Sequence, residues 1–101
     1  MLEKLKIRNL TIIDNLSIEF DSRFNVITGE SGSGKTIIYK SINYLFGEKF
    51  NKDDIRKSES NCEISGIIKS GDLKYEVRRI FSKTSTRNFI NGKSKTRANY
   101  L

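Results

Sequence analysis

A glycine-rich run near the N-terminus has the residue types and spacing of a phosphate-binding loop. It reads Gly29, Glu30, Ser31, Gly32, Ser33, Gly34, Lys35 and Thr36. Glycine lets the backbone adopt positive φ and approach an anion, so that successive N–H groups point into one concavity. Lys35 is placed to reach the β- and γ-phosphates of a nucleotide, and the Thr36 hydroxyl to ligate the Mg²⁺ that bridges them. The run therefore predicts a site for ATP with Mg²⁺, in which Ser31 and Ser33 add hydroxyl donors.

The elements around this run are the ones that such a loop needs. Residues 24–28 are short and rich in β-formers, as expected for a buried parallel strand that runs into Gly29. Residues 35–46 predict a helix, with Gly47 as its C-cap and with one apolar face made of Ile38, Ile42, Leu45 and Phe46. The N-terminus of that helix presents N–H groups and partial positive charge to the same anion.

The rest of the chain alternates in the manner of β-strands. Residues 2–10 and 16–20 predict two half-buried strands around a turn at Asp14-Asn15, and residues 48–60 predict a polar loop with a helical turn at 53–56. A β-meander follows, with Cys62, Ile64, Gly66 and Ile68 on one face of its first strand. Its return strand includes both Ile80 and Phe81, which implies a bulge, and Asn91-Gly92 predicts a type I′ hairpin. The fold class expected is α/β with a mixed sheet, in which strands flank one P-loop helix and an antiparallel meander ends the chain.

Composition and charge narrow the class of protein. Apolar residues make up 36% and charged residues 31% of the 101 residues, which is polar for a globular domain but too apolar for a disordered chain. One cysteine and no histidine exclude an internal disulfide and a zinc site of the usual kind. No apolar run is long enough to span a bilayer, and the N-terminus is no signal peptide, so a cytoplasmic protein is expected.

The net charge of +7 is concentrated in the second half of the chain. Residues 1–50 hold 7 basic and 6 acidic side chains, whereas residues 51–101 hold 12 and 6. No acidic residue follows Glu76, and the basic residues after it include Lys93 and Lys95 in the C-terminal hairpin. Such a stretch attracts nucleic acid phosphates. A solvated strand face, or a surface for an acidic partner, explains it equally well.

With these motifs, the chain resembles the N-terminal head segment of RecN, a bacterial DNA repair ATPase related to the SMC proteins. The similarity rests on residues 5–10, 13–20 and 24–36, and Glu30 separates the loop from those of most SMC and RecF proteins. Further matches cover almost the whole length: Leu45-Phe46-Gly47, Asp54-Ile55-Arg56 and Phe89-Ile90-Asn91-Gly92. Ser31, Ser33 and Thr36 stand where Thr, Ala and Ser are commoner, and P-loop chemistry tolerates all three.

The resemblance implies that residues 1–101 are the N-terminal lobe of an ABC/SMC-type ATPase head. It implies ATP and Mg²⁺ as cofactors, and DNA as a partner of the full-length protein. For Arg56 it implies a phosphate contact, although a solvated loop arginine explains that residue equally well. It also implies that a C-terminal half-head and a second head, in a homodimer, complete the enzyme. In such ATPases the signature motif and the Walker B acids lie in the second segment, and no match to them occurs here. We therefore assign no catalytic residue to this chain, and its own ATPase activity stays undecided.

Other interpretations fit the same residues. The chain resembles, less closely, the head segments of other SMC or RecF-like ATPases of chromosome maintenance. It also fits a binding module that holds nucleotide without hydrolysis, or a truncated product with an incomplete core.

Overall fold

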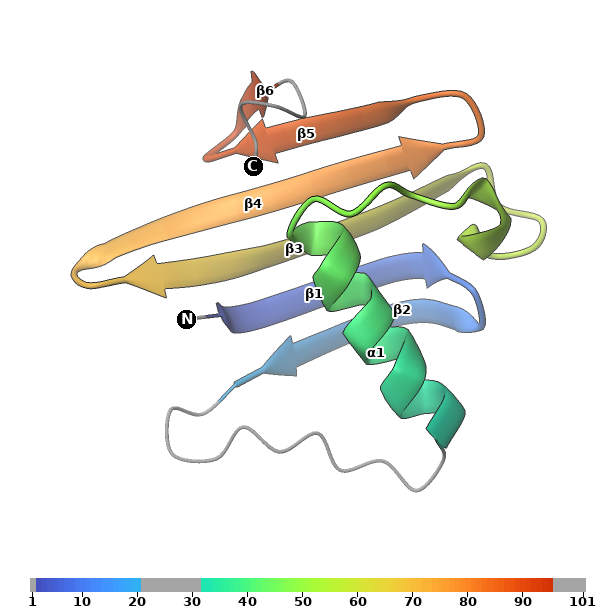
Figure 1. Cartoon of the computed structure of the whole chain (residues 1–101), viewed down its shortest axis with the longest axis horizontal. Helices are drawn as coiled ribbons and strands as arrows, with labels where there is room; N and C mark the ends of the chain where they lie inside the picture. Colours follow the sequence, from blue (N-terminus) through green and yellow to red (C-terminus); the bar gives the residue numbers. More distant parts are fainter. Residues whose placement is uncertain (1, 21–31, 96–101) are drawn as a thin grey trace.

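The computed structural model describes residues 2–20 and 32–95, which form one antiparallel sheet with a single α-helix across one face (Figure 1). The strand order is β2-β1-β3-β4-β5-β6. The strands are β1 (Leu2–Leu10), β2 (Ile13–Glu19), β3 (Asn61–Ser70), β4 (Leu73–Ser82), β5 (Thr86–Ile90) and β6 (Lys93–Lys95). The helix α1 spans Gly32–Leu45, and a 3₁₀ turn, η1, spans Lys52–Asp54.

The core lies between α1 and the inner face of the sheet. Side chains alternate between the two faces of a strand, and the inward set of β1, β3 and β4 is buried. It comprises Leu5, Ile7, Cys62, Ile64, Val77 and Phe81, which cluster with Tyr44 and Leu45 of α1. Gly66 lets the helix come close, because a Cβ there would lie 2.7 Å from the Lys4 carbonyl oxygen and 2.9 Å from Leu45 Cδ2.

This architecture confirms the fold class for the part of the chain that the structure describes: strands flanking one helix, and a meander of β3 to β6. The parallel strand expected at residues 24–28 lies outside the described residues. The type I′ hairpin is confirmed, because Asn91 and Gly92 both have positive φ, 51° and 80°. Among the described residues, no helix has the length and apolarity to cross a membrane.

Three local predictions were wrong. The first turn lies at Thr11 and Ile12, because Leu10 already pairs with Ile13 and so leaves only two residues to reverse the chain. The helix ends at Leu45, and Phe46 beyond it is 51% exposed, so it does not share the apolar face.

The third wrong prediction is the bulge in β4. The register between β3 and β4 runs unbroken from Asn61↔Ser82 to Ser70↔Leu73. Strict alternation then points Arg79 inward and Ile80 outward. A buried arginine in place of an isoleucine is stable here because its guanidinium is hydrogen-bonded, as described below.

Candidate nucleotide-binding site

The N-terminus of α1 carries the second half of the predicted phosphate loop. Gly32, Ser33, Gly34 and Lys35 form the first turn of the helix, and no acidic residue lies in that turn. The first N–H groups of a helix have no partner within it and carry the positive end of the helix dipole. Because no carboxylate in the turn offsets that charge, the helix end is suited to hold an anion. The remaining predicted residues, Gly29, Glu30 and Ser31, lie outside the described part of the chain.

Thr36, the predicted Mg²⁺ ligand, is exposed at the start of the second turn of α1. It belongs to the stripe of the helix that points away from the sheet. Within residues 2–20 and 32–95, no three His, Cys, Asp or Glu side chains converge to hold a metal ion. Beside a nucleotide, Mg²⁺ usually keeps phosphate oxygens and several waters among its ligands, so a single protein hydroxyl from this part of the chain is compatible with such a site.

The far end of α1 is closed by backbone capping and is fixed to the sheet by a buried arginine. Gly47, at φ 109°, donates its N–H to the Tyr44 carbonyl, and the Glu48 N–H reaches the Asn43 carbonyl, both at 3.1 Å. This pair of bonds is a Schellman cap, and it confirms the role expected of Gly47. Arg79, only 1% exposed, donates from Nη1 to the Tyr44 and Glu48 carbonyls at 2.6 and 2.9 Å. Its positive charge thus lies at the negative end of the helix dipole.

A second network ties α1 to the loop that follows it. The Tyr44 hydroxyl donates to Asp54 Oδ2 at 2.5 Å, and Lys40 Nζ lies 3.3 Å from the same oxygen. Burial, and then the hydrogen bond to Asp54, raise the pKa of Tyr44 to about 12. The phenol therefore stays a neutral donor at physiological pH. Tyr44 and Lys40 are four residues apart on one helical face, which is why both reach a single carboxylate.

The loop that carries Arg56 is pinned against the hairpin of β1 and β2. Thr11 donates its N–H to the Asp54 carbonyl at 2.7 Å, and Arg56 donates its N–H to the Asn9 carbonyl at 2.8 Å. The half-buried Arg56 side chain donates from Nη1 to the Ile12 carbonyl at 3.1 Å. These bonds hold Arg56 in one place although it lies in a loop.

A hollow of about 480 Å³ opens beside Arg56. It is lined by Thr11, Ile12, Asp53, Ile55, Arg56 and Lys57. Ile12 is 71% exposed, so the rim offers an apolar surface next to a guanidinium. An anionic molecule with an apolar portion fits that combination of groups.

The structure thus positions the predicted residues of α1 and Arg56 on a common framework, through the Lys40–Tyr44–Asp54 network. Sequence reasoning missed the residues of that framework. The spacing of Lys40 and Tyr44, four residues apart on the buried side of α1, could have predicted that the two polar groups share a partner. Nothing in the sequence marked Asp54 as their partner, because it comes from a polar loop and only the fold buries it.

A protein-family model described as an AAA domain matches residues 4–100 of the chain. The chain is 36% identical over 69 residues to the DNA repair protein RecN of Treponema pallidum, a match that covers 68% of this chain and 12% of that protein. It is 30% identical over 101 residues to the DNA repair protein RecN of Aquifex aeolicus, covering 100% of this chain and 18% of the relative. The similarity to RecN expected from the motifs is confirmed, and the chain spans less than a fifth of these relatives.

Two solved structures share the fold. The recombination mediator protein RecF of the RecFOR pathway, in its ATPrS form, superposes with a TM-score of 0.88 at 19% identity, covering 100% of this chain and 29% of RecF. The SMC head domain from Thermotoga maritima superposes with a TM-score of 0.79 at 23% identity, covering 97% of this chain and 40% of that domain. At such identities the likeness shows the fold, which is that of the expected head.

Proposed function

The chain belongs to the AAA domain family, and on that premise we propose that it is the ATP-binding N-terminal lobe of a RecN-type DNA repair ATPase head. One observation carries the proposal. The helix that opens with Gly32, Ser33, Gly34 and Lys35 is clamped to the sheet at its far end, and the loop of Arg56 is clamped to the same helix. A phosphate loop needs such a rigid support, because small displacements of its donors weaken an electrostatic site steeply.

Each predicted residue has a role in this proposal. Gly29, Glu30, Ser31, Gly32, Ser33 and Gly34 supply backbone N–H groups that surround the phosphates. Lys35 neutralises the β- and γ-phosphates, and Thr36 ligates Mg²⁺. Arg56, held by the Ile12 carbonyl at the edge of the hollow, adds a further cation to the phosphates. None of these groups positions a water for attack, so they bind ATP and leave the cleavage to other residues.

The exposed side of α1 offers a surface on which a partner segment can pack. Thr36, Tyr39 and Asn43 point away from the sheet, and Tyr39 is 52% exposed. Phe46, which follows the helix on the same side, is 51% exposed. Large aromatic groups in such a row are typical of a surface that another element covers. We infer that the C-terminal half-head packs here, that a second head in a homodimer completes the ATP site, and that the assembly acts on DNA in the cytoplasm.

Melting of the chain with different adenine nucleotides tests the ATP site. A ligand present at about 100 times its Kd stabilises the folded state by about 2.7 kcal/mol. Because the donors are aimed at the β- and γ-phosphates, ATP and ADP with Mg²⁺ should raise the Tm and AMP should not. Equal shifts with all three nucleotides, or no shift with any, would refute the phosphate loop.

The partner segment is tested by complementation. Mixing the chain with the separately produced C-terminal segment of a RecN relative should raise ATP turnover well above that of either part. The change Tyr39→Glu should abolish the increase without changing ATP binding, because it places a charge on the covered side of α1. An undiminished increase with that variant would remove this side of the helix from the interface.

A further inference from the structure

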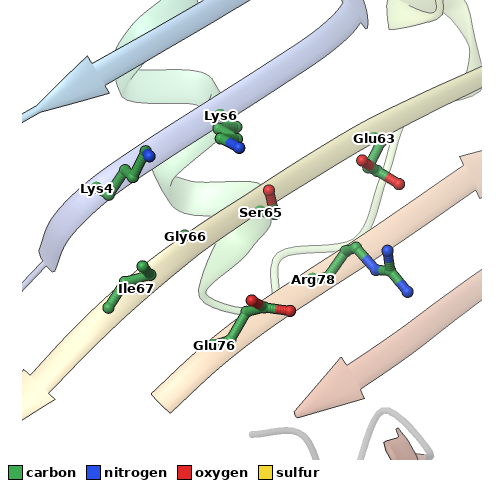
Figure 2. Close-up of a pocket in the computed structure, with 8 residues that line it drawn as sticks. All are labelled: Lys4, Lys6, Glu63, Ser65, Gly66, Ile67, Glu76 and Arg78. Atoms are coloured by element: carbon green, nitrogen blue, oxygen red, sulfur yellow. The ribbon is translucent and has the colours of Figure 1, made fainter. Parts of the chain in front are cut away.

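The face of the sheet opposite α1 carries polar and basic side chains and is open in the described part of the chain. Its outward residues, here called the open face, come from β1, β2, β3, β4 and β5. Figure 2 shows its centre, where side chains of the three central strands stand on the side away from the helix. The cations of the open face are Lys4, Lys6, Arg8, Lys69, Lys74, Arg78 and Arg87, and its acids are Asp14, Glu19, Glu63 and Glu76. Lys4 is partly neutralised, because its Nζ lies 3.9 Å from Glu19 Oε1.

The basic side chains of the open face form two lines: a row that runs across the strands and a column that runs along β1. Lys6, Ser65 and Arg78 are successive cross-strand partners. With strands about 4.8 Å apart, the backbones that carry Lys6 and Arg78 lie about 10 Å apart, and Ser65 stands between them. Lys4, Lys6 and Arg8 follow one another along β1 at intervals of about 6.7 Å. That interval is about twice the 3.4 Å axial spacing of phosphates on one DNA strand.

A shallow hollow lies at the crossing of the row and the column. It measures about 270 Å³ and is lined by Lys4, Lys6, Glu63, Ser65, Gly66, Ile67, Glu76 and Arg78 (Figure 2). Arg78 Nε is buried there without a hydrogen-bond partner. Lys6, Ser65 and Arg78 together offer donors from three strands to one anion, which is the arrangement that phosphate oxygens accept.

We propose that the open face binds the sugar-phosphate backbone of duplex DNA, with Lys6, Ser65 and Arg78 at its centre. The inference rests on the proposed function in one respect, since it takes DNA as the substrate of the repair ATPase and assigns the surface that holds it. It places DNA on the side of the sheet opposite α1, so that one lobe engages ATP and DNA from opposite faces.

Two features favour a duplex backbone over other occupants. Phe89, the aromatic residue of the open face, has the guanidinium carbons of Arg78 and Arg87 at 4.9 and 5.4 Å from its ring centroid. Because cations occupy the surroundings of the ring, it is poorly placed to stack on the bases of a single strand. A protein partner fits less well, because the cores of protein interfaces are depleted in lysine and glutamate, and both lie at the centre here.

Salt-dependent binding of a labelled duplex to the full chain tests the proposal. Anisotropy with a duplex of two helical turns, about 21 base pairs, gives the slope of log K against log salt. Neutralising one phosphate contact reduces that slope by about 0.9. The double variant Lys6→Gln/Arg78→Gln should therefore reduce it by about 2. The matched double variant Lys49→Gln/Lys52→Gln removes two exposed cations from the segment between α1 and β3 and should leave the slope unchanged.

The change Ser65→Glu separates loss of binding from loss of folding. The new carboxylate would stand between Lys6 and Arg78, where opposite charges on neighbouring strands stabilise a sheet. We expect the Tm to be unchanged or raised while duplex affinity falls at least tenfold at low salt. Retained affinity in this variant, an equal slope change in the Lys49/Lys52 control, or tighter binding of the single strand than of the duplex would each overturn the proposal.

The nucleotide-dependent Tm shift distinguishes a failure here from a failure of the proposed function. Variants of the open face should keep the full shift with ATP and Mg²⁺, because they lie on the far side of the sheet from α1. A chain that shows the ATP shift but no salt-dependent duplex binding would refute the open face alone. A chain that binds the duplex through Lys6 and Arg78 but shows no ATP shift would refute the ATP lobe alone.

Discussion

The two adjacent arginines of β4 should differ sharply in their effect on stability. Arg79 is 1% exposed on the inner face, where it meets the end of α1, whereas Arg78 lies on the open face. Replacing each by methionine keeps a similar length and apolar stem. The comparison therefore isolates what the guanidinium does on each side of the same strand.

The cost of Arg79→Met follows from the bonds that it removes. Arg79 Nε donates to Asn88 Oδ1 at 2.7 Å, and Nη1 donates to the carbonyls of Tyr44 and Glu48. Tyr44 O keeps the Gly47 N–H as a donor, so the main loss falls on Asn88, which is 5% exposed. A hydrogen bond from a charged group contributes about 1.5–3 kcal/mol, and breaking a buried network costs about 3–5 kcal/mol. We expect a loss of about 3 kcal/mol in the free energy of unfolding.

Arg78→Met should cost about 1 kcal/mol or less, since it removes mainly the cation–π contact with Phe89. Urea unfolding followed by circular dichroism measures both variants. The double variant Arg79→Met/Asn88→Leu should recover at least about 1 kcal/mol, because it also removes the buried amide oxygen that has lost its bond from Arg79 Nε. Equal costs for the two arginine variants, or no recovery in the double variant, would refute the view that Arg79 anchors α1.

Three further predictions concern close packing, proton linkage and the nucleotide. Gly66→Ala should destabilise the chain by about 1–3 kcal/mol in urea unfolding, since its Cβ would lie 2.7 Å from the Lys4 carbonyl oxygen, whereas Ser65→Ala should be nearly neutral. Burial raises the pKa of Cys62 from 9.0 to about 12 and that of Tyr44 from 10.0 to about 12. Above pH 9.0 the folded chain then holds more protons than the unfolded chain. The Tm should therefore fall as the pH rises from 9.0 to about 12. The change Cys62→Ala should make the first part of that fall less steep. Arg56→Ala should lower the affinity for ATP about tenfold, as the loss of one charge-assisted bond of about 1.4 kcal/mol implies, while Lys49→Ala leaves the ATP-induced Tm shift unchanged.

Alternation of side chains predicted much of the sheet correctly. The apolar positions Leu5 and Ile7 in β1, and Cys62 and Ile64 in β3, are all buried as their spacing indicated. The Asn91-Gly92 turn was readable because only residues that tolerate positive φ suit a type I′ hairpin. These features depend on neighbours in the sequence, and a local pattern is enough to specify them.

The features that the sequence did not reveal depend on contacts between distant segments. An arginine at position 79 looks like a surface residue, and its burial needs carbonyls from the end of α1 and an amide from β5. Asp54 looks like a loop carboxylate until α1 brings Lys40 and Tyr44 against it. In both cases a polar group is stable inside only because its partners come from elsewhere in the fold.

The glycine-rich run was predicted from the sequence because phosphate chemistry restricts which residues can serve, and Arg56 was predicted from the resemblance to RecN. Both stay predictions. The structure adds how they are supported: a capped helix, a buried arginine at its end, and a tyrosine–aspartate bond to the following loop. We place the proposed DNA contact on the open face, where cations from several strands meet, and not on Lys93 and Lys95 of the C-terminal hairpin.

The central claim is that α1 and the run before it hold the phosphates of ATP. Titration calorimetry with a non-hydrolysable ATP analogue and Mg²⁺ tests it most directly, on the wild-type chain, on Lys35→Ala and on the matched surface variant Lys49→Ala. We expect one site in the wild type, the same affinity in Lys49→Ala, and binding about ten- to a hundredfold weaker in Lys35→Ala, the equivalent of about 1.5–3 kcal/mol. Undiminished affinity in Lys35→Ala, or no heat of binding in the wild type, would contradict it.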